Sequence, residues 1–197
     1  MRALVLEVSQ EELARRKLTG IDRWDDMWEG VLHMSPAPAQ EHQRIVTELT
    51  AFLVPLLKRA RRGLARVGIN VVDQTSGEES YRIPDLTFVA RGRESILAKD
   101  GTRGGGPDAV IEIRSPGDET YDKLPFFAGL GVREIVVIDR DTKKPEVYRL
   151  AGRQYVAVAA EHDGWVRSET LGVRLRVVDG PRLVLEDLAD PSNCTEI

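Results

Sequence analysis

The sequence predicts an α/β fold in which a mixed β-sheet is flanked by helices. Residues 109–113 (AVIEI) and 134–138 (EIVVI) are two short, almost purely apolar runs, which is typical of strands buried on both faces of a sheet. From Gln40 to about Arg62 the apolar positions recur at steps of three and four, which predicts an amphipathic helix. We expect residues 1–197 to form one domain, because this length suffices for a single hydrophobic core.

The composition narrows the class of protein. Hydrophobic residues make up 42% and charged residues 30% of the chain, so neither disorder nor a membrane protein is indicated. No run approaches the ~18 uninterrupted apolar residues of a membrane span, and the first apolar run is too short for a signal peptide. We therefore expect a cytoplasmic protein. The formal net charge of −4 counts against a protein that coats nucleic acid nonspecifically, but it allows a nuclease with one basic face. The single cysteine, Cys194, excludes an internal disulfide and a cysteine zinc cluster.

Two further helices are predicted. Ser9 and Glu12 form a capping-box pattern that opens a short helix ending near Lys17. Residues 121–130 predict another helix, which Gly131 terminates.

Prolines and glycines mark where the elements stop. Pro36 and Pro38 break the chain before the long helix, and Pro55 is expected to kink that helix or interrupt it near Val54. A glycine-rich loop is expected at 103–107. Further strands are expected at residues 31–34, 65–72, 86–90, 146–150, 154–160, 173–178 and 183–188. The last three place additional short strands towards the C-terminus.

The most informative residue is Glu112, an acid within an apolar strand. Burial of a carboxylate is costly unless the group is paired or binds a metal. Arg114, Ser115 and Pro116 end the strand directly afterwards, so Glu112 lies near a strand end, where the active sites of α/β sheets collect. Taken alone, an edge-strand acid that faces solvent is an equally good interpretation.

Asp85 is the second candidate. Pro84 fixes the backbone before strand 86–90 and removes a hydrogen-bond donor, so Asp85 opens that strand. If strands 86–90 and 109–113 pair, Asp85 and Glu112 can converge on one cation. Two carboxylates, a backbone carbonyl and waters suit octahedral Mg²⁺, or Mn²⁺ in its place. Without that context, a Pro-Asp pair is more often a turn or a cap.

Lys123 completes a candidate site for phosphodiester hydrolysis. The reaction needs a deprotonated water and neutralisation of the charge on the phosphoryl oxygens. A divalent metal with a nearby ammonium group supplies both, and Lys123 lies one turn into the helix predicted after Glu112. A solvated lysine on a helix surface is an equally good interpretation of this residue.

Several short segments, taken together, carry a resemblance to a known family. They are WEGVL at 28–32 followed by Pro36, Pro38 and His42, then YRIPD at 81–85, IEIRSP at 111–116, YDKLPFF at 121–127, GVRE at 131–134 and VID at 137–139. In this order and spacing they resemble the Uma-type restriction endonuclease family of the PD-(D/E)XK nuclease superfamily. The resemblance is strongest over residues 24–150.

The resemblance implies a restriction-endonuclease-like core and a metal-dependent endonuclease that acts on DNA. It implies that Asp85 and Glu112 hold the metal, that Lys123 assists the attacking water, and that the protein is a homodimer. The superfamily usually has a lysine two residues after the acid, whereas this chain has Arg114 there, and arginine cannot act as a general base at neutral pH. In the Uma-type family the lysine lies in the following helix, which matches Lys123.

Arg114 and His42 are candidates for substrate contacts. Arg114 could clamp a phosphate or pair with Glu112. His42 could reach the substrate from the long helix, although packing or surface exposure is the commoner role of a lone histidine. The basic run from Lys58 to Arg66 either follows a DNA backbone or is a solvated helix end.

Two other functions stay open at this stage. The arginine at position 114 and the acidic net charge also suit a nuclease-fold binding module that has lost catalysis. A phosphohydrolase that acts on small nucleotides is a weaker alternative. A measurement of Mg²⁺ or Mn²⁺ binding distinguishes the non-catalytic module from a metal-dependent endonuclease. A substrate screen distinguishes the phosphohydrolase from the endonuclease.

Overall fold

The central element of the fold is a six-stranded mixed sheet. The computed structural model describes residues 3–5, 9–35, 37–77 and 79–197, so the break expected at Pro36 lies outside the described residues. The strand order is β13–β12–β11–β10–β7–β4. The bounds are β4 Gly63–Val67, β7 Leu86–Ala90, β10 Ala109–Arg114, β11 Glu134–Asp139, β12 Pro145–Ala151 and β13 Gln154–Ala157. The predicted α/β class with a mixed sheet is confirmed.

The middle of this sheet is apolar on both faces. β10 and β11 pair in parallel over their whole length, and β10 pairs on its other edge with β7, which is antiparallel. A parallel pair needs a crossover connection. The 3-10 turn η3, Tyr121–Lys123, and helix α3, Leu124–Gly129, lie in this crossover. Because both faces are covered, these two strands are almost entirely buried, as predicted for interior strands.

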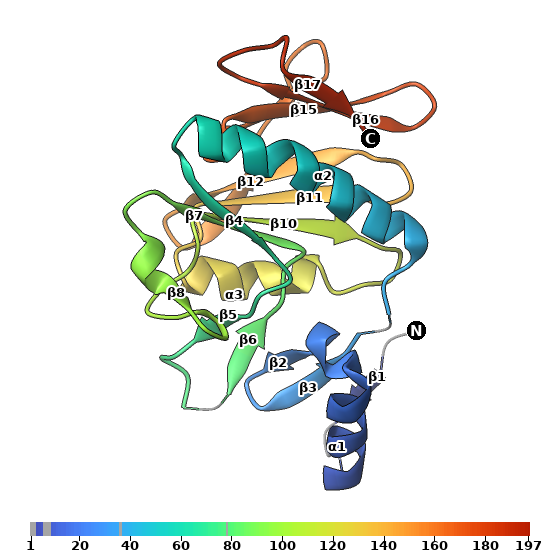
Figure 1. The fold of residues 1–197 in the computed structure, drawn as a ribbon, viewed down its shortest axis with the longest axis vertical. Helices are drawn as coiled ribbons and strands as arrows, with labels where there is room; N and C mark the ends of the chain where they lie inside the picture. Colours follow the sequence, from blue (N-terminus) through green and yellow to red (C-terminus); the bar gives the residue numbers. More distant parts are fainter. Residues whose placement is uncertain (1–2, 6–8, 36, 78) are drawn as a thin grey trace.

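Helices lie on both sides of the central sheet (Figure 1). Helix α2, Gln40–Arg59, packs on one side, and its buried residues share a core with β7, β10, β11 and the C-terminal strands. It is therefore enclosed between two sheets. Helix α3 lies on the other side, where Phe127 packs against Val110, Ile135 and Val137. Successive side chains of β10 thus enter different cores.

Helix α2 runs through Pro55 to Arg59, so of the two predicted effects of Pro55, a kink or a break near Val54, the break is wrong. Proline lacks the N–H that would bond to the carbonyl of Ala51. Both Ala51 and Pro55 are exposed, so water can bond to that carbonyl while the opposite side of the helix stays packed. Of the described helices, none is long and apolar enough to cross a membrane.

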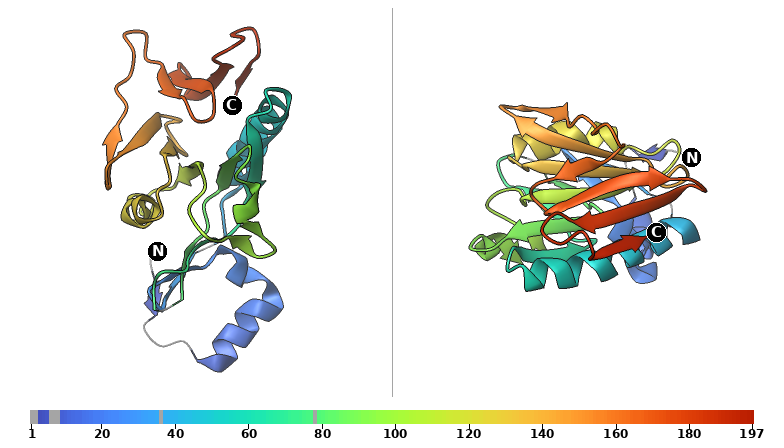
Figure 2. Two further views of the ribbon diagram at one scale, coloured as in Figure 1. Left: turned by 90° about the vertical axis from the view of Figure 1, so that its left-hand side faces the viewer. Right: turned by 90° about the horizontal axis from the view of Figure 1, so that it is seen from above.

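Strands from the N-terminal part of the chain and from residues 71–102 form a seven-stranded sheet, which we call the N-terminal sheet. Its strands β1, β2, β3 and β6 lie at the bottom of Figure 1, and the left view of Figure 2 shows the same end of the molecule. The strand order of this sheet is β1–β3–β2–β6–β5–β9–β8. The bounds are β1 Ala3–Val5, β2 Asp26–Trp28, β3 Val31–Met34, β5 Val71–Asp73, β6 Ser80–Arg82, β8 Leu97–Ala98 and β9 Gly101–Thr102. Glu29 and Gly30 join β2 to β3 with positive φ angles of 46° and 80°, as a tight hairpin requires. Ser9 caps the N-terminus of helix α1, Gln10–Thr19. As predicted, its side chain accepts a hydrogen bond from the N–H of Glu12. The 3-10 turns η1 and η2 span Ile21–Trp24 and Glu94–Ile96.

Two predicted elements are divided in the structure. The strand predicted at 65–72 is two strands, because Gly68, with a φ of 56°, turns the chain between β4 and β5, which belong to different sheets. The helix predicted at 121–130 is η3 followed by α3, with Pro125 in the first turn of α3, where a missing N–H is tolerated. The other predicted strands are observed, with ends shifted by a few residues.

A four-stranded antiparallel sheet covers α2 from the side opposite to the central sheet (Figure 2). It consists of β14 Val166–Ser168, β15 Val173–Val178, β16 Arg182–Asp187 and β17 Cys194–Glu196. Glu134 connects it to the central sheet, because its Oε2 accepts hydrogen bonds from Ser168 Oγ at 2.9 Å and from the N–H of Thr170 at 2.8 Å. The predicted C-terminal strands are thus present, although β14 and β17 are too short to show in the sequence pattern.

Candidate active site

Strand pairing brings Asp85 and Glu112 together. The ladder between β7 and β10 has Leu86 opposite Ile111. Extending this register by one residue places Asp85 opposite Glu112, and opposed side chains share one face of a sheet. It is the face covered by α3, because Val110, two residues before Glu112, packs in that core. The sheet therefore supplies the convergence that the sequence suggested for the two acids.

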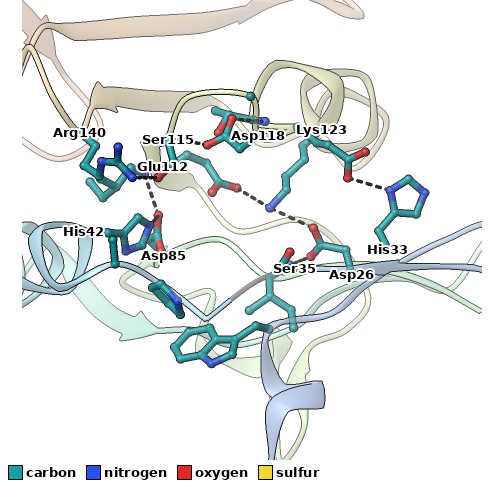
Figure 3. A pocket seen from close by; sticks show the side chains of 18 of the residues that line it. Asp26, His33, Ser35, His42, Asp85, Glu112, Ser115, Asp118, Lys123 and Arg140 are labelled. Atoms are coloured by element: carbon teal, nitrogen blue, oxygen red, sulfur yellow. Dashed lines mark hydrogen bonds and ion pairs between the residues drawn. The ribbon is translucent and has the colours of Figure 1, made fainter. Parts of the chain in front are cut away.

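Two contacts hold Asp85 at the start of β7. Its Oδ2 accepts a hydrogen bond from the N–H of Ile113 at 2.7 Å and lies 3.3 Å from His42 Nε2. Both contacts use the same oxygen, so neither engages Oδ1. His42 belongs to the first turn of α2, so the beginning of this helix reaches the site (Figure 3).

Glu112 is almost completely buried, with 5% of its surface exposed. Burial is the main reason why the pKa of Glu112 is raised to about 8. The charge of Lys123 opposes this rise, whereas the carboxylates of Asp85 and Asp26 add to it. Glu112 Oε1 accepts no hydrogen bond from the described residues. A buried carboxylate with an oxygen that makes no hydrogen bond, close to other carboxylates, is an environment that favours a cation.

Lys123 reaches between two carboxylates (Figure 3). Its Nζ lies 3.0 Å from Asp26 Oδ2 and 3.5 Å from Glu112 Oε1. Burial disfavours the charged amine, but Asp26 and Glu112 outweigh burial and raise the pKa of Lys123 above its ordinary value. In this arrangement Lys123 is an ammonium at neutral pH. It can stabilise negative charge, but it cannot accept a proton.

Asp26 is a member of the site that the sequence did not reveal. It is the first residue of β2 and is 3% exposed. Its Oδ1 accepts the N–H of Ile83 at 2.7 Å, while Oδ2 pairs with Lys123. Asp26 thus connects the N-terminal sheet to the segment before Asp85 and to the ammonium. The available signal was the acidic and aromatic run at 24–29, which by itself indicates only a lead into a strand.

These groups line one pocket of about 300 Å³. Further polar side chains in its wall include His33, Ser115, Glu119 and Arg140. His33 Nδ1 lies 2.8 Å from Glu119 Oε2, and its ring stacks on Trp28 at 4.2 Å. Arg140 Nη1 lies 3.4 Å from Ser115 Oγ. The pocket therefore combines a cluster of acids with one guanidinium group from the described residues.

Arg114 lies outside this pocket. Its guanidinium pairs with Asp139 at 2.8 Å and lies over the ring of Tyr121, 5.3 Å from the centroid. The alternative of an ion pair with Glu112 is therefore not observed. The reason is the parallel ladder, in which Arg114 stands opposite Asp139. Arg140 takes the place in the pocket wall that the sequence suggested for Arg114.

The donor set fits a hard divalent cation that retains several waters. In the described ranges, no group of three or more His, Cys, Asp or Glu side chains is arranged to hold a metal. Mg²⁺ is commonly bound by only one or two carboxylates, with water in the other positions. Asp85 and Glu112 can supply these carboxylates. The observation that supports this fit is the buried Oε1 of Glu112, which accepts no hydrogen bond from the described residues and has the ammonium of Lys123 3.5 Å away.

The raised pKa of Glu112 predicts how the stability of the metal-free protein depends on pH. Glutamate titrates at 4.5 in the unfolded chain and at about 8 in the folded protein, so the folded state binds more protons between these values. The free energy of unfolding should therefore fall as pH rises through this interval. In EDTA, we expect the melting temperature of the wild type to fall by several degrees more than that of Glu112→Gln between pH ~5.5 and ~8. The same pH dependence in both proteins would show that Glu112 is not the titrating group.

The mixed α/β architecture, together with a family match and a structural match, defines the class as a restriction-endonuclease-like fold. The sequence model of the Uma2 family, described as "Putative restriction endonuclease", matches residues 11–178. This span is well over half of the chain, so the chain belongs to the Uma2 family. No curated protein matches the chain at a significant level.

A solved structure shares this fold. The crystal structure of a putative nuclease belonging to DUF820 from Anabaena variabilis matches with a TM-score of 0.59 and 20% sequence identity. The match covers 75% of this chain and 82% of that chain. At this level of identity the likeness concerns the fold alone, and it confirms the fold that the sequence motifs indicated.

Proposed function

We propose that the protein is an endonuclease that hydrolyses DNA phosphodiester bonds with Mg²⁺ or Mn²⁺. The observation that carries the proposal is the meeting of Asp85, Glu112 and Lys123 in one pocket. Membership of a family described as restriction endonucleases supports DNA as the substrate and a divalent metal as the cofactor.

Asp85 and Glu112 are the proposed metal ligands. A bound divalent metal supplies charge neutralisation at the phosphoryl group and lowers the pKa of a bound water. Glu112 is shielded from solvent, so its charge interacts more strongly with a cation than a surface carboxylate does. Lys123 holds an ammonium beside Glu112, where it stabilises negative charge that develops during attack on the phosphate.

Arg140 and His42 are the proposed contacts around the substrate. Arg140 lines the pocket and pairs with Asp141, an exposed residue, so its guanidinium can exchange that partner for a phosphate. His42 Nε2 faces Asp85, so we propose that it orients this carboxylate as well as approaching the substrate.

Incubation of purified protein with supercoiled plasmid and Mg²⁺ or Mn²⁺ tests the proposal. We expect nicking that requires the metal and disappears in Asp85→Ala. Nicking that survives this substitution would reject the site. Duplex binding without cleavage under any metal would instead favour a nuclease-fold module that has lost catalysis.

Asp26 is proposed to position Lys123 without touching the substrate. Asp26→Asn keeps an oxygen for the N–H of Ile83 but removes a charge that raises the pKa of Lys123. We expect the nicking rate to fall about 100-fold with little change in the KM for DNA. The alkaline limb of the pH–rate profile should move to lower pH, because Lys123 then loses its proton more readily. Asp26→Glu, which keeps the carboxylate, should retain part of the wild-type rate. A pH–rate profile of Asp26→Asn that matches the wild type would mean that Asp26 has a purely structural role.

A further inference from the structure

Helix α2 passes into β4 beside the end of β7 (Figure 1). Five cationic residues belong to this corner. We call this cluster the basic corner, and its members are Lys58, Arg59, Arg61, Arg62 and Arg91. All five are exposed. Arg91 is distant in sequence but adjacent in space, because its N–H donates to the carbonyl of Arg62 at 2.7 Å.

The basic corner lacks partners of opposite charge. More than half of the lysines and arginines of the chain form ion pairs, as Arg44 and Arg149 do, whereas none of the five does so with a described carboxylate. Arg62 is tied to the C-terminal sheet through the carbonyl of Glu169. The helix macrodipole explains a cation in the last turn of α2, but Arg61 and Arg91 lie beyond the helix. A chain with a net charge of −4 therefore keeps concentrated positive charge at this corner.

Arg66, which the sequence groups with this run, is not part of the corner. Its neighbour Ala65 packs against the core that contains α2. Because side chains alternate along a strand, Arg66 points to the other face of the sheet.

Helix α2 connects the basic corner to the pocket. His42 lines the pocket in its first turn, and Lys58 lies in its last turn. Sixteen positions at about 1.5 Å each give about 24 Å, which is the length of about seven base pairs of duplex. The acid Glu48 on this path is paired with Arg44. The exposed positions between the two ends are all uncharged, namely Thr47, Ala51, Val54 and Pro55.

We propose that the basic corner is a second contact surface for duplex DNA, about seven base pairs from the bond that is cut. The inference rests on the proposed function and adds a length requirement to it, because a duplex that engages both sites must extend this far on one side of the cut. Charge complementarity identifies the partner. Guanidinium groups bind phosphate bidentately, and a duplex presents phosphates in a continuous row.

Salt-dependent duplex binding tests this proposal. A fluorescein-labelled duplex of about 24 base pairs, long enough to span both sites, is titrated with protein in Ca²⁺ without Mg²⁺. The test variant is Arg59→Gln/Arg61→Gln/Arg91→Gln. The matched control is Lys17→Gln/Lys99→Gln/Arg153→Gln, which removes the same charge from exposed residues that do not belong to the basic corner.

We expect the test variant to bind at least about tenfold more weakly than the wild type at ~0.1 M salt. The plot of log K against log salt should become less steep, with the magnitude of its negative slope smaller by about two to three, because each phosphate contact contributes about 0.9. The control should change affinity by less than about twofold, since screened charges distant from the DNA contribute little. Because the substituted residues are exposed, both variants should melt close to the wild type. If the triple variant unfolds, Arg91→Gln alone should lower the slope by about 0.9.

Two results would overturn the proposed role of the basic corner without affecting the proposed active site. One is the same affinity and slope in the test variant and its control, and the other is weakened binding to vesicles of anionic phospholipid with duplex binding unchanged. Either would leave the active site standing, because plasmid nicking reports on it separately. A wild-type protein that neither binds duplex nor nicks plasmid would overturn both proposals.

Discussion

Replacement of Glu112 by glutamine is expected to reduce metal-dependent nicking about 1000-fold or more. The amide has nearly the same shape but no charge, so one of the two proposed anionic ligands is lost. Glu112 is only 5% exposed, and its charge therefore acts in a low dielectric. Single-turnover nicking at saturating plasmid concentration measures the loss.

The matched control is Asp122→Asn, which removes a carboxylate from an exposed residue beside Lys123 on the same 3-10 turn. Its nicking rate should lie within about twofold of the wild-type rate, because a screened surface charge contributes little to catalysis. Glu112→Gln should remain folded at neutral pH, since the raised pKa of Glu112 shows that the fold does not favour its charged form. A folded Glu112→Gln protein that nicks as fast as this control would remove Glu112 from the mechanism.

The second large effect concerns stability. Lys123→Met should lower the free energy of unfolding of the metal-free protein by about 3 kcal/mol. Its ammonium is the partner of two buried carboxylates, at 3.0 Å from Asp26 and 3.5 Å from Glu112. Methionine fills the space but leaves the buried Asp26 without its counter-ion, whereas Glu112, whose pKa is raised, can take up a proton. Added Mg²⁺ should recover part of the loss, because binding to the folded state stabilises it.

Urea unfolding, with and without Mg²⁺, measures this difference. Lys144→Met is the control, because Lys144 is 69% exposed and its loss should cost no more than about 0.5 kcal/mol. Lys123→Arg keeps the charge and should retain more stability than activity, since the guanidinium cannot occupy the position of a compact ammonium. If Lys123→Met is as stable as the control, Lys123 is not the counter-ion of these acids.

Part of the site could be predicted because its signals are local. Glu112 stands out as an acid within the buried apolar strand β10. Asp85 follows Pro84 and directly precedes β7, the strand that pairs with β10. Lys123 follows Glu112 closely, in the crossover that a parallel pair requires. Strands β7 and β10, which position Asp85 and Glu112, are apolar and regular, so the sequence pattern was sufficient to identify them.

The remainder depends on contacts between distant segments. Asp26 meets Lys123 only because β2 pairs with β6 and carries it to the pocket. Arg114 is turned towards Asp139 by the parallel ladder, which leaves Arg140 in the pocket wall. The division between β4 and β5 likewise follows from their assignment to different sheets, which no local periodicity encodes.

Anomalous diffraction from a crystal soaked in Mn²⁺ tests most directly whether Asp85 and Glu112 share one cation. We predict a single strong anomalous peak in the pocket, at a ligand distance of about 2.0–2.5 Å from a carboxylate oxygen of each residue. The peak should be absent from a crystal of Glu112→Gln. A peak bound elsewhere, or none between these two acids at a Mn²⁺ concentration that supports nicking, would contradict the shared site.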